Sequence, residues 1–326
     1  MTQSDRFNTE LAMRESVFFD GPTASARYSR FWLLLILASI IASAGVVADS
    51  TATVIGAMIV APLMTPILGT MLATVLGDRA NLIRSLLLVL AGAGAAVVIG
   101  FLVGSLVVTD VLADTNTQVA GRVSPGLIDL LAALGTGVVG SVALVRKDIS
   151  DTLPGVAIAI SLVPPLAVVG LTLESGSVPQ ALGALLLFLT NVVAIIGTGI
   201  VVMSFYGVNK LSRSDAEGHK RSLRRPVLLI SFMVLLVGIP LALSSISVAS
   251  RSIIEGVVHG VTDTWAAEVG WEVTSVVTTA GETTVRLEGP MPLPSTADLK
   301  ERLAEVGVLT QNVTVELVPI YTVELD

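Results

Sequence analysis

Residues 50–69 read STATVIGAMIVAPLMTPILG, an apolar stretch long enough to cross a bilayer. Pro62 and Pro66 lie near the level that would be the middle of the membrane. A helix in lipid keeps its backbone hydrogen bonds to itself, because hydrocarbon offers no other partners. Each proline removes one amide donor and crowds a carbonyl one turn earlier. The stretch therefore predicts a transmembrane helix that is broken or kinked at mid-depth.

The composition of the whole chain predicts an integral membrane protein. Its 326 residues are 53% hydrophobic and only 14% charged, whereas soluble domains carry about 25% charged residues. Stretches of the length that a spanning helix needs lie near residues 30–48, 50–76, 82–109, 125–146, 152–174, 178–206 and 227–249. Lys and Arg concentrate in alternate loops, which predicts a cytoplasmic N-terminus and, after seven spans, an extracytoplasmic C-terminus.

These spans divide the chain into five predicted parts. They are a polar N-terminal segment (1–28), a six-span α-helical membrane core (29–206), a basic cytoplasmic loop (207–226), a seventh helix (227–250) and a C-terminal domain (251–326). Leu11, Val17 and Phe18 predict a short amphipathic surface helix in the first part. The basic loop is better explained by anionic lipid headgroups than by nucleic acid.

The C-terminal part alternates apolar and polar residues, unlike the membrane core. Alternation predicts strands over residues 271–279, 283–288 and 312–323. Helices are expected over residues 251–268 and over residues 295–306, the second with Ser295 as its N-cap. The order helix–strand–strand–helix–strand predicts a small α+β domain, for which a ferredoxin-like topology is one candidate.

The first three spans resemble the next three when the sequence is shifted by 99 residues. The matched positions include Gly56 and Gly155, Pro66 and Pro165, and Asp49 and Asp148. Because each repeat has an odd number of spans, the second enters the membrane from the opposite side. The pattern thus predicts a 3+3 inverted-repeat core, in which residues 153–170, LPGVAIAISLVPPLAVVG, are the interrupted partner of the opening stretch. Paired interruptions of this kind are a sequence pointer to a transport site.

Side chains near the two interruptions form the predicted substrate site. Its members are Pro62, Met64, Thr65, Pro66, Ser161, Pro164, Pro165 and Asn191. Freed amides at helix N-termini attract anions, and freed carbonyls suit cations. As alternatives, Thr and Ser in a helix commonly bond their own i−4 carbonyl, and Asn191 could join two helices. Asp49 and Asp148 lie at span ends, as candidates for gating or ion capture or as loop caps.

The residue types and motifs that the sequence lacks limit which functions the protein can have. No Asp, Glu, Lys, Arg or His lies near the middle of a span, although proton-coupled transport commonly uses a buried carboxylate. We therefore expect a neutral solute, an ion held by backbone groups, or a role other than transport. The chain has no cysteine and no H-E-x-x-H or P-loop motif. We expect no enzyme activity, no cofactor and no metal site.

Small residues recur at four-residue intervals in the third span, at Gly92, Ala96, Gly100 and Gly104. They create one smooth helix face that permits close approach of another helix. Packing within the same chain is the first interpretation of this face. A homo-oligomer formed through it is the alternative.

Three segments carry a family resemblance: SRFWLLLILASIIASAGVVADSTATVIGAMIVAPLMTPILG, LPGVAIAISLVPPLAVVGL and GALLLFLTNVVAIIG. They resemble the prokaryotic DUF389 proteins, a family of hydrophobic-domain membrane proteins, over about residues 17–206. The resemblance implies a prokaryotic cytoplasmic membrane and transfers no activity or site residues. The leading expectation is a transporter or channel-like protein for a small solute or ion. The alternative is a membrane sensor or scaffold whose C-terminal domain binds a ligand or partner.

Overall fold

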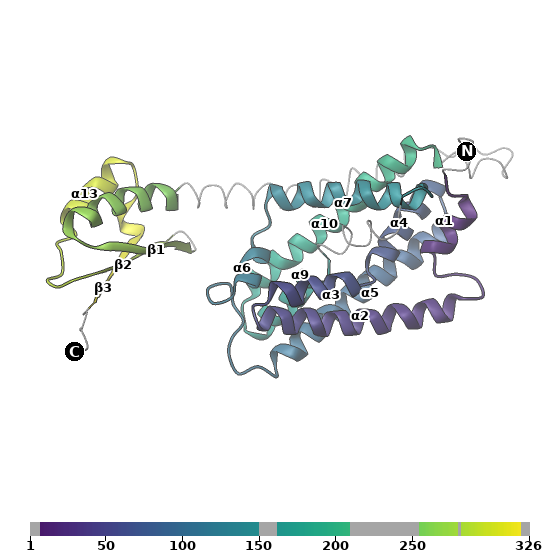
Figure 1. The fold of residues 1–326 in the computed structure, drawn as a ribbon, viewed down its shortest axis with the longest axis horizontal. Coiled ribbons are helices and arrows are strands. Elements are labelled where there is room, and N and C mark those ends of the chain that lie inside the picture. The colour runs from purple at the N-terminus through teal and green to yellow at the C-terminus, as the bar shows by residue number, and fades with distance from the viewer. Residues whose placement is uncertain (1–6, 150–161, 209–253, 280–281, 321–326) are drawn as a thin grey trace. The chain divides into compact units, whose positions relative to one another are not determined.

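A computed structural model describes residues 7–149, 162–208, 254–279 and 282–320 of the chain (Figure 1). The chain forms two compact units, residues 1–244 and 245–326, which are considered separately below. Ser161, the predicted seventh span at residues 227–249 and most of the basic loop lie outside the described residues.

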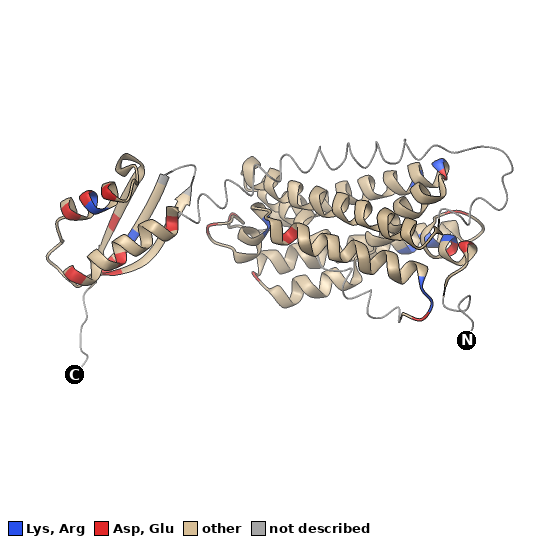
Figure 2. Ribbon diagram, turned by 90° about the horizontal axis from the view of Figure 1, so that it is seen from above, with Lys and Arg blue, Asp and Glu red and all other residues tan. Residues whose placement is uncertain are grey.

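The described part of the first unit is helical. Its helices are α1 (Glu10–Val17), α2 (Ala24–Val47), α3 (Thr51–Val60), α4 (Met64–Leu76), α5 (Arg79–Gly104), α6 (Thr117–Val123), α7 (Leu127–Val145), α9 (Val163–Glu174) and α10 (Val178–Phe205). By length and composition α2, α5, α7 and α10 can each cross a membrane, and the bent pair α3–α4 would make a fifth span. Figure 2 shows long stretches of these helices without a charged residue. These features are those of a membrane protein.

The predicted break in the opening stretch is confirmed, although the two prolines act differently. Helix α3 ends at Val60, α4 begins at Met64, and their axes differ by 47°. Pro62 lies in the break itself. Pro66 is the third residue of α4, where an amide would have no intrahelical acceptor in any case, so proline is tolerated there. The expectation that both prolines interrupt the helix is therefore wrong for Pro66.

Helix α1 is the short amphipathic helix that the sequence predicts, and it lies on the unit with one side buried. Met13, Val17 and Phe18 are 1%, 3% and 0% exposed, and they belong to the same buried cluster as residues of α4. Leu11, which the amphipathic pattern assigned to the apolar face, is 67% exposed. The sequence pattern thus identified the helix and placed Val17 and Phe18 on its buried side correctly, but it was wrong for Leu11.

The second unit is a three-stranded sheet with helices on one face. A helix over residues 254–269 precedes β1 (Glu272–Thr279), β2 (Glu282–Gly289), α13 (Ala297–Glu305), the short 3-10 helix η3 (Thr310–Asn312) and β3 (Val313–Pro319). The sheet order is β1-β2-β3, with β1 and β2 antiparallel and β2 and β3 parallel. In a ferredoxin-like fold another strand separates the parallel pair. The direct pairing of β2 with β3 therefore contradicts that candidate topology.

Buried and exposed side chains alternate along β2, and this alternation shows which face of the sheet the helices cover. Val285 and Leu287 are buried with Trp265 and Leu303 from the helices, whereas Arg286 between them is exposed. The predicted N-cap Ser295 is wrong, because α13 begins at Ala297 after Thr296 and has no side-chain cap hydrogen bond.

Candidate functional site

Contacts along α5 establish the level at which α4 begins. Gly92 lies midway along α5, and a Cβ placed there would be 2.9 Å from Leu63 Cδ2. Leu63 immediately precedes α4, which packs on α5 and joins it through the turn at residues 77–78. Helix α4 therefore starts at the middle of α5 and runs back toward its Arg79 end.

Helix α9 covers the other half of α5. A Cβ at Gly100 would meet Ala167 O at 2.7 Å, and one at Gly104 would meet Glu174 Oε2 at 3.1 Å. Residue numbers rise together in these contacts, so α9 runs parallel to α5. Val163, one turn before Ala167, is then level with Ala96. The two helices start about one turn apart along α5 and run away from its middle in opposite directions.

The same contacts show how the small-residue face is used. All four of its residues are buried, Gly92 against α2 and the start of α4, and Gly100 and Gly104 against α9. This is packing within the chain, the first of the two interpretations given above.

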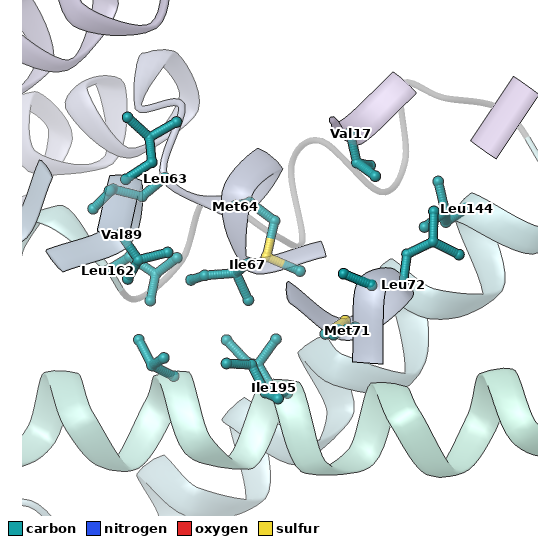
Figure 3. Packing of buried hydrophobic residues seen from close by; sticks show 14 of the residues in the cluster. Val17, Leu63, Met64, Ile67, Met71, Leu72, Val89, Leu144, Leu162 and Ile195 are labelled. Atoms are coloured by element: carbon teal, nitrogen blue, oxygen red, sulfur yellow. The ribbon is translucent and has the colours of Figure 1, made fainter. Parts of the chain in front are cut away.

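Asn191 reaches the same level through α10. A Cβ at Gly199 would touch Met71 Cγ at 3.3 Å, and Figure 3 shows Ile195 facing Ile67 in the buried cluster. In both pairs the two residue numbers differ by the same amount, so α10 runs parallel to α4. One turn earlier, Asn191 is level with Leu63. Asn191 is 2% exposed.

The start of α4 is buried among apolar side chains. Leu63, Met64, Ile67 and Leu162 are all at most 7% exposed and share one cluster (Figure 3). Pro164 and Pro165, the second and third residues of α9, are buried as well. Of the predicted site residues that the structure describes, all except Asp49 and Asp148 therefore lie at or close to the two helix starts.

The Thr65 hydroxyl does not donate to the carbonyl four residues earlier, which was the alternative interpretation of this residue. Thr70, Thr74 and Thr172 each donate to the i−4 carbonyl, at 2.9, 2.7 and 2.7 Å. The Thr65 hydroxyl makes no hydrogen bond in the described part of the chain, and its amide donates to Pro62 O at 3.2 Å. The reason is local: the i−4 residue, Ala61, precedes the helix, so its carbonyl is not aligned with the axis of α4.

Backbone carbonyls and backbone amides both lack intrahelical hydrogen-bond partners at the break between α3 and α4. The carbonyls of residues 58–60 end α3, and Pro62 has no amide to offer them. At the start of α4, the amides of Leu63 and Met64 have no backbone partner within the described ranges. Either set can contact a solute, the carbonyls as acceptors and the amides as donors.

Comparison with known proteins covers this region. Residues 58–197 match the family described as a domain of unknown function, DUF389. These residues are similar to the DUF389 family, and they are called the DUF389-like segment below. The match includes the starts of α4 and α9 and Asn191, and it confirms the resemblance found in the sequence. An uncharacterised protein of Methanocaldococcus jannaschii is 31% identical over 207 residues, which cover 64% of this chain and 63% of the relative. No solved structure matches the chain.

Asp49 lies before the DUF389-like segment, away from the helix starts. It accepts hydrogen bonds from the Thr117 hydroxyl at 2.8 Å and the Gln118 amide at 3.0 Å, which together hold the pKa of its carboxyl below the ordinary value. Asp49 thereby ties the α2–α3 turn to α6, as a loop cap does. Asp148 accepts from Arg146 Nε at 2.8 Å, just after α7. Gating or ion capture by either residue stays a prediction.

No metal-site cluster occurs in the parts of the chain that the structure describes. Nowhere in those parts do three His, Asp or Glu side chains gather as metal ligands would.

Sequence reasoning missed a polar network that joins residues near the N-terminus to the turn between α4 and α5. Arg14 Nη2 donates to Asp78 Oδ2 at 2.6 Å, and Asn81 Nδ2 donates to Asp20 at 2.9 Å and to Asp78 at 3.0 Å. Nearer the N-terminus, the Asn8 backbone amide and side chain donate to the Val145 and Leu144 carbonyls at the end of α7, both at 2.9 Å. We call residues 7–20 the N-terminal strap. The strap links the α4–α5 turn to α7.

We expect Asp78→Asn to destabilise the membrane unit at neutral pH by about 1–3 kcal/mol, since it weakens hydrogen bonds to a charged acceptor. Burial works to raise the pKa of Asp78, but hydrogen bonds from Asn81 and Arg14 outweigh it and lower the pKa. The Asp78 contribution is thus present above the ordinary carboxyl range and lost as pH falls through the lowered pKa. Thermal unfolding in detergent at neutral and acidic pH measures the difference, with Asp110→Asn at an exposed position as control. Equal destabilisation by Asp78→Asn at all pH values would contradict the electrostatic explanation.

Proposed function

We propose that the protein is a transporter or channel-like protein for a small solute or ion, with its site in the DUF389-like segment where α4 and α9 begin. One observation carries the proposal: two helices start near the middle of α5 and run apart in opposite directions. Interrupting helices inside a membrane leaves backbone groups without partners, which is tolerated where they line a cavity or contact a ligand.

The position of the prolines supports a paired origin for these two helix starts. Pro66 and Pro165, which match in the 99-residue shift, are each the third residue of their helix. The opposite directions of α4 and α9 are those expected for the corresponding helices of an inverted repeat. We include the 3+3 inverted repeat and a cytoplasmic N-terminus in the proposal.

Solute flux into liposomes that contain the purified protein tests this function. A panel of small ions and neutral solutes should include at least one that enters only protein-containing vesicles. Asn191→Leu and Thr65→Val, which remove polar groups at the helix starts, should lower that flux about tenfold, equivalent to about 1.4 kcal/mol.

The matched control for Thr65→Val is Thr136→Val. Thr136 is half-buried on α7, like Thr65 on α4, and its hydroxyl donates to Ala132 O at 2.9 Å. Solute flux through the Thr136→Val variant should equal that through the wild type. If no solute in the panel enters, or if the Thr65 and Asn191 variants transport normally, the proposed site is refuted.

A membrane sensor or scaffold is the second candidate, favoured by the separate core of the C-terminal unit. That core contains Trp265, Trp271, Leu299 and Leu303, so the unit can present a surface of its own. Under this alternative, deletion of residues 251–326 abolishes the cellular role, while the Thr65 variant retains it.

A further inference from the structure

We propose that the site at the helix starts takes a small, weakly hydrated anion, such as chloride or nitrate. The inference rests on the proposed function and names its substrate class. A helix N-terminus carries about half a positive charge. Helices α4 and α9 run away from the middle of α5, so both positive ends lie there, about one turn apart along that helix.

Side-chain charge near this level does not oppose an anion. Helices α4 and α10 contain no charged residue, and the one in α9 is Glu174, its last residue. Glu174 is about 16 Å along the helix from Val163. The positive potential of the two helix ends therefore acts without a neighbouring carboxylate in these three helices.

A buried hydroxyl on α2 provides an independent indication of a ligand. Ser39 is 0% exposed, and its Oγ has no hydrogen-bond partner in the described structure. The next serine along the helix, Ser43, donates to Ser39 O at 2.8 Å, as serines in helices commonly do. Buried hydroxyls are usually satisfied, so an unsatisfied one requires an explanation.

The position of Ser39 places this hydroxyl beside the start of α9. Leu35, one turn earlier on the same face of α2, would be 3.2 Å from a Cβ at Gly92. Helix α2 runs in the same direction as α5, because Phe31 contacts Phe19 near the strap while Val46 is bonded by Asn116 after α5. Ser39 is then level with Ala96, where α9 begins. Helix α2 packs against both α5 and α9, so the Ser39 O–H can donate to an anion between the helix starts.

The limited number of donors selects the type of anion. Pro66, Pro164 and Pro165 contribute no amides to the first turns, and Thr65 and Asn191 are the polar members among the predicted site residues that the structure describes there. The donors at this level include the Leu63 and Met64 amides and the Thr65 and Ser39 hydroxyls. A multivalent, strongly hydrated anion such as sulfate would lose more hydration than these donors replace.

The freed carbonyls at the end of α3 are the feature that would instead favour a cation. Ile59 and Val60 are 57% and 38% exposed, whereas Leu63 and Met64 are 1% and 7% exposed. Met58, the third residue with a freed carbonyl, is 8% exposed, so two of these three residues lie at the surface of the unit, whereas the amide end of the break lies toward its core.

Ion-selective flux through the full-length protein in liposomes tests the inference. Chloride and nitrate should enter faster than sulfate, potassium or glycerol, and Ser39→Ala should lower chloride flux about tenfold. Removing an unsatisfied buried hydroxyl does not threaten folding. The control is Ser105→Ala, because Ser105 is exposed at the end of α5 and bonds Leu102 O at 2.8 Å.

The outcomes separate the two proposals. Potassium or glycerol flux without chloride flux overturns the anion inference and leaves the transport function standing. Absence of flux for every probe overturns both. Chloride flux that Ser39→Ala leaves unchanged removes the assigned hydroxyl site. A chloride-dependent rise in the unfolding temperature of the wild type, reduced in Ser39→Ala, would support binding by a measurement independent of flux.

Discussion

Gly100→Leu is expected to prevent α9 from packing on α5 and to abolish the folded membrane unit. A Cβ at Gly100 already comes within 2.7 Å of Ala167 O and 3.2 Å of Gly170 Cα. Backbone atoms cannot rotate away as a side chain does, so the helices must separate. Overpacking of a tight core costs about 1–3 kcal/mol, and more where the backbone is the obstacle. Yield of monodisperse protein and unfolding temperature in detergent measure the effect.

Gly94→Leu is the matched control, because it introduces the same side chain into the same helix. Gly94 is exposed and has no atom within 4 Å of its Cβ position. Its variant should fold like the wild type, since leucine is also the better helix former. Comparable losses for both variants would mean that the glycines matter for backbone flexibility and not for the α5–α9 contact.

The second large effect is expected for Leu303→Ala in the C-terminal unit. Leu303 is 2% exposed and packs with Trp265 and Val285. Replacing a buried leucine by alanine costs about 2–5 kcal/mol, a large share of the stability of a domain this small. Limited proteolysis and hydrogen exchange of the full-length protein should show the C-terminal unit opening while the membrane unit stays protected.

Leu309→Ala makes the same chemical change at a position that is 66% exposed. This variant should leave the C-terminal unit as well protected from proteolysis and hydrogen exchange as it is in the wild type. If both leucine variants open this unit equally, the assigned core is incorrect.

Sequence periodicity predicted the long helices well, because each depends on a continuous apolar stretch. Helices α2, α5, α7 and α10 correspond to predicted spans, and most of their ends lie within a few residues of the predicted ones. The effect of Pro66 was harder to predict, since it depends on where α4 begins. Pro62 ends the preceding helix, which turns Pro66 from an interruption into a first-turn residue.

Contacts between residues distant in sequence explain most of what was missed. Arg14 and Asp78 are 64 positions apart, and an amphipathic pattern looks the same whether its apolar side meets lipid or a protein core. Ser39 could not be distinguished from Ser43, because only packing decides which hydroxyl has a partner. Among the candidates, Thr65 and Asn191 share one level, whereas Asp49 and Asp148 follow the ends of α2 and α7.

The N-terminal strap has a consequence for biosynthesis. Asn8 and its acceptor Leu144 are separated by 136 positions, so this early segment waits while α2 to α7 are synthesised and inserted. Such non-local closures form slowly and leave apolar surface uncovered meanwhile. The contact between the strap and the end of α7 can therefore form only after α7 has been synthesised, which leaves the membrane unit incompletely closed until then.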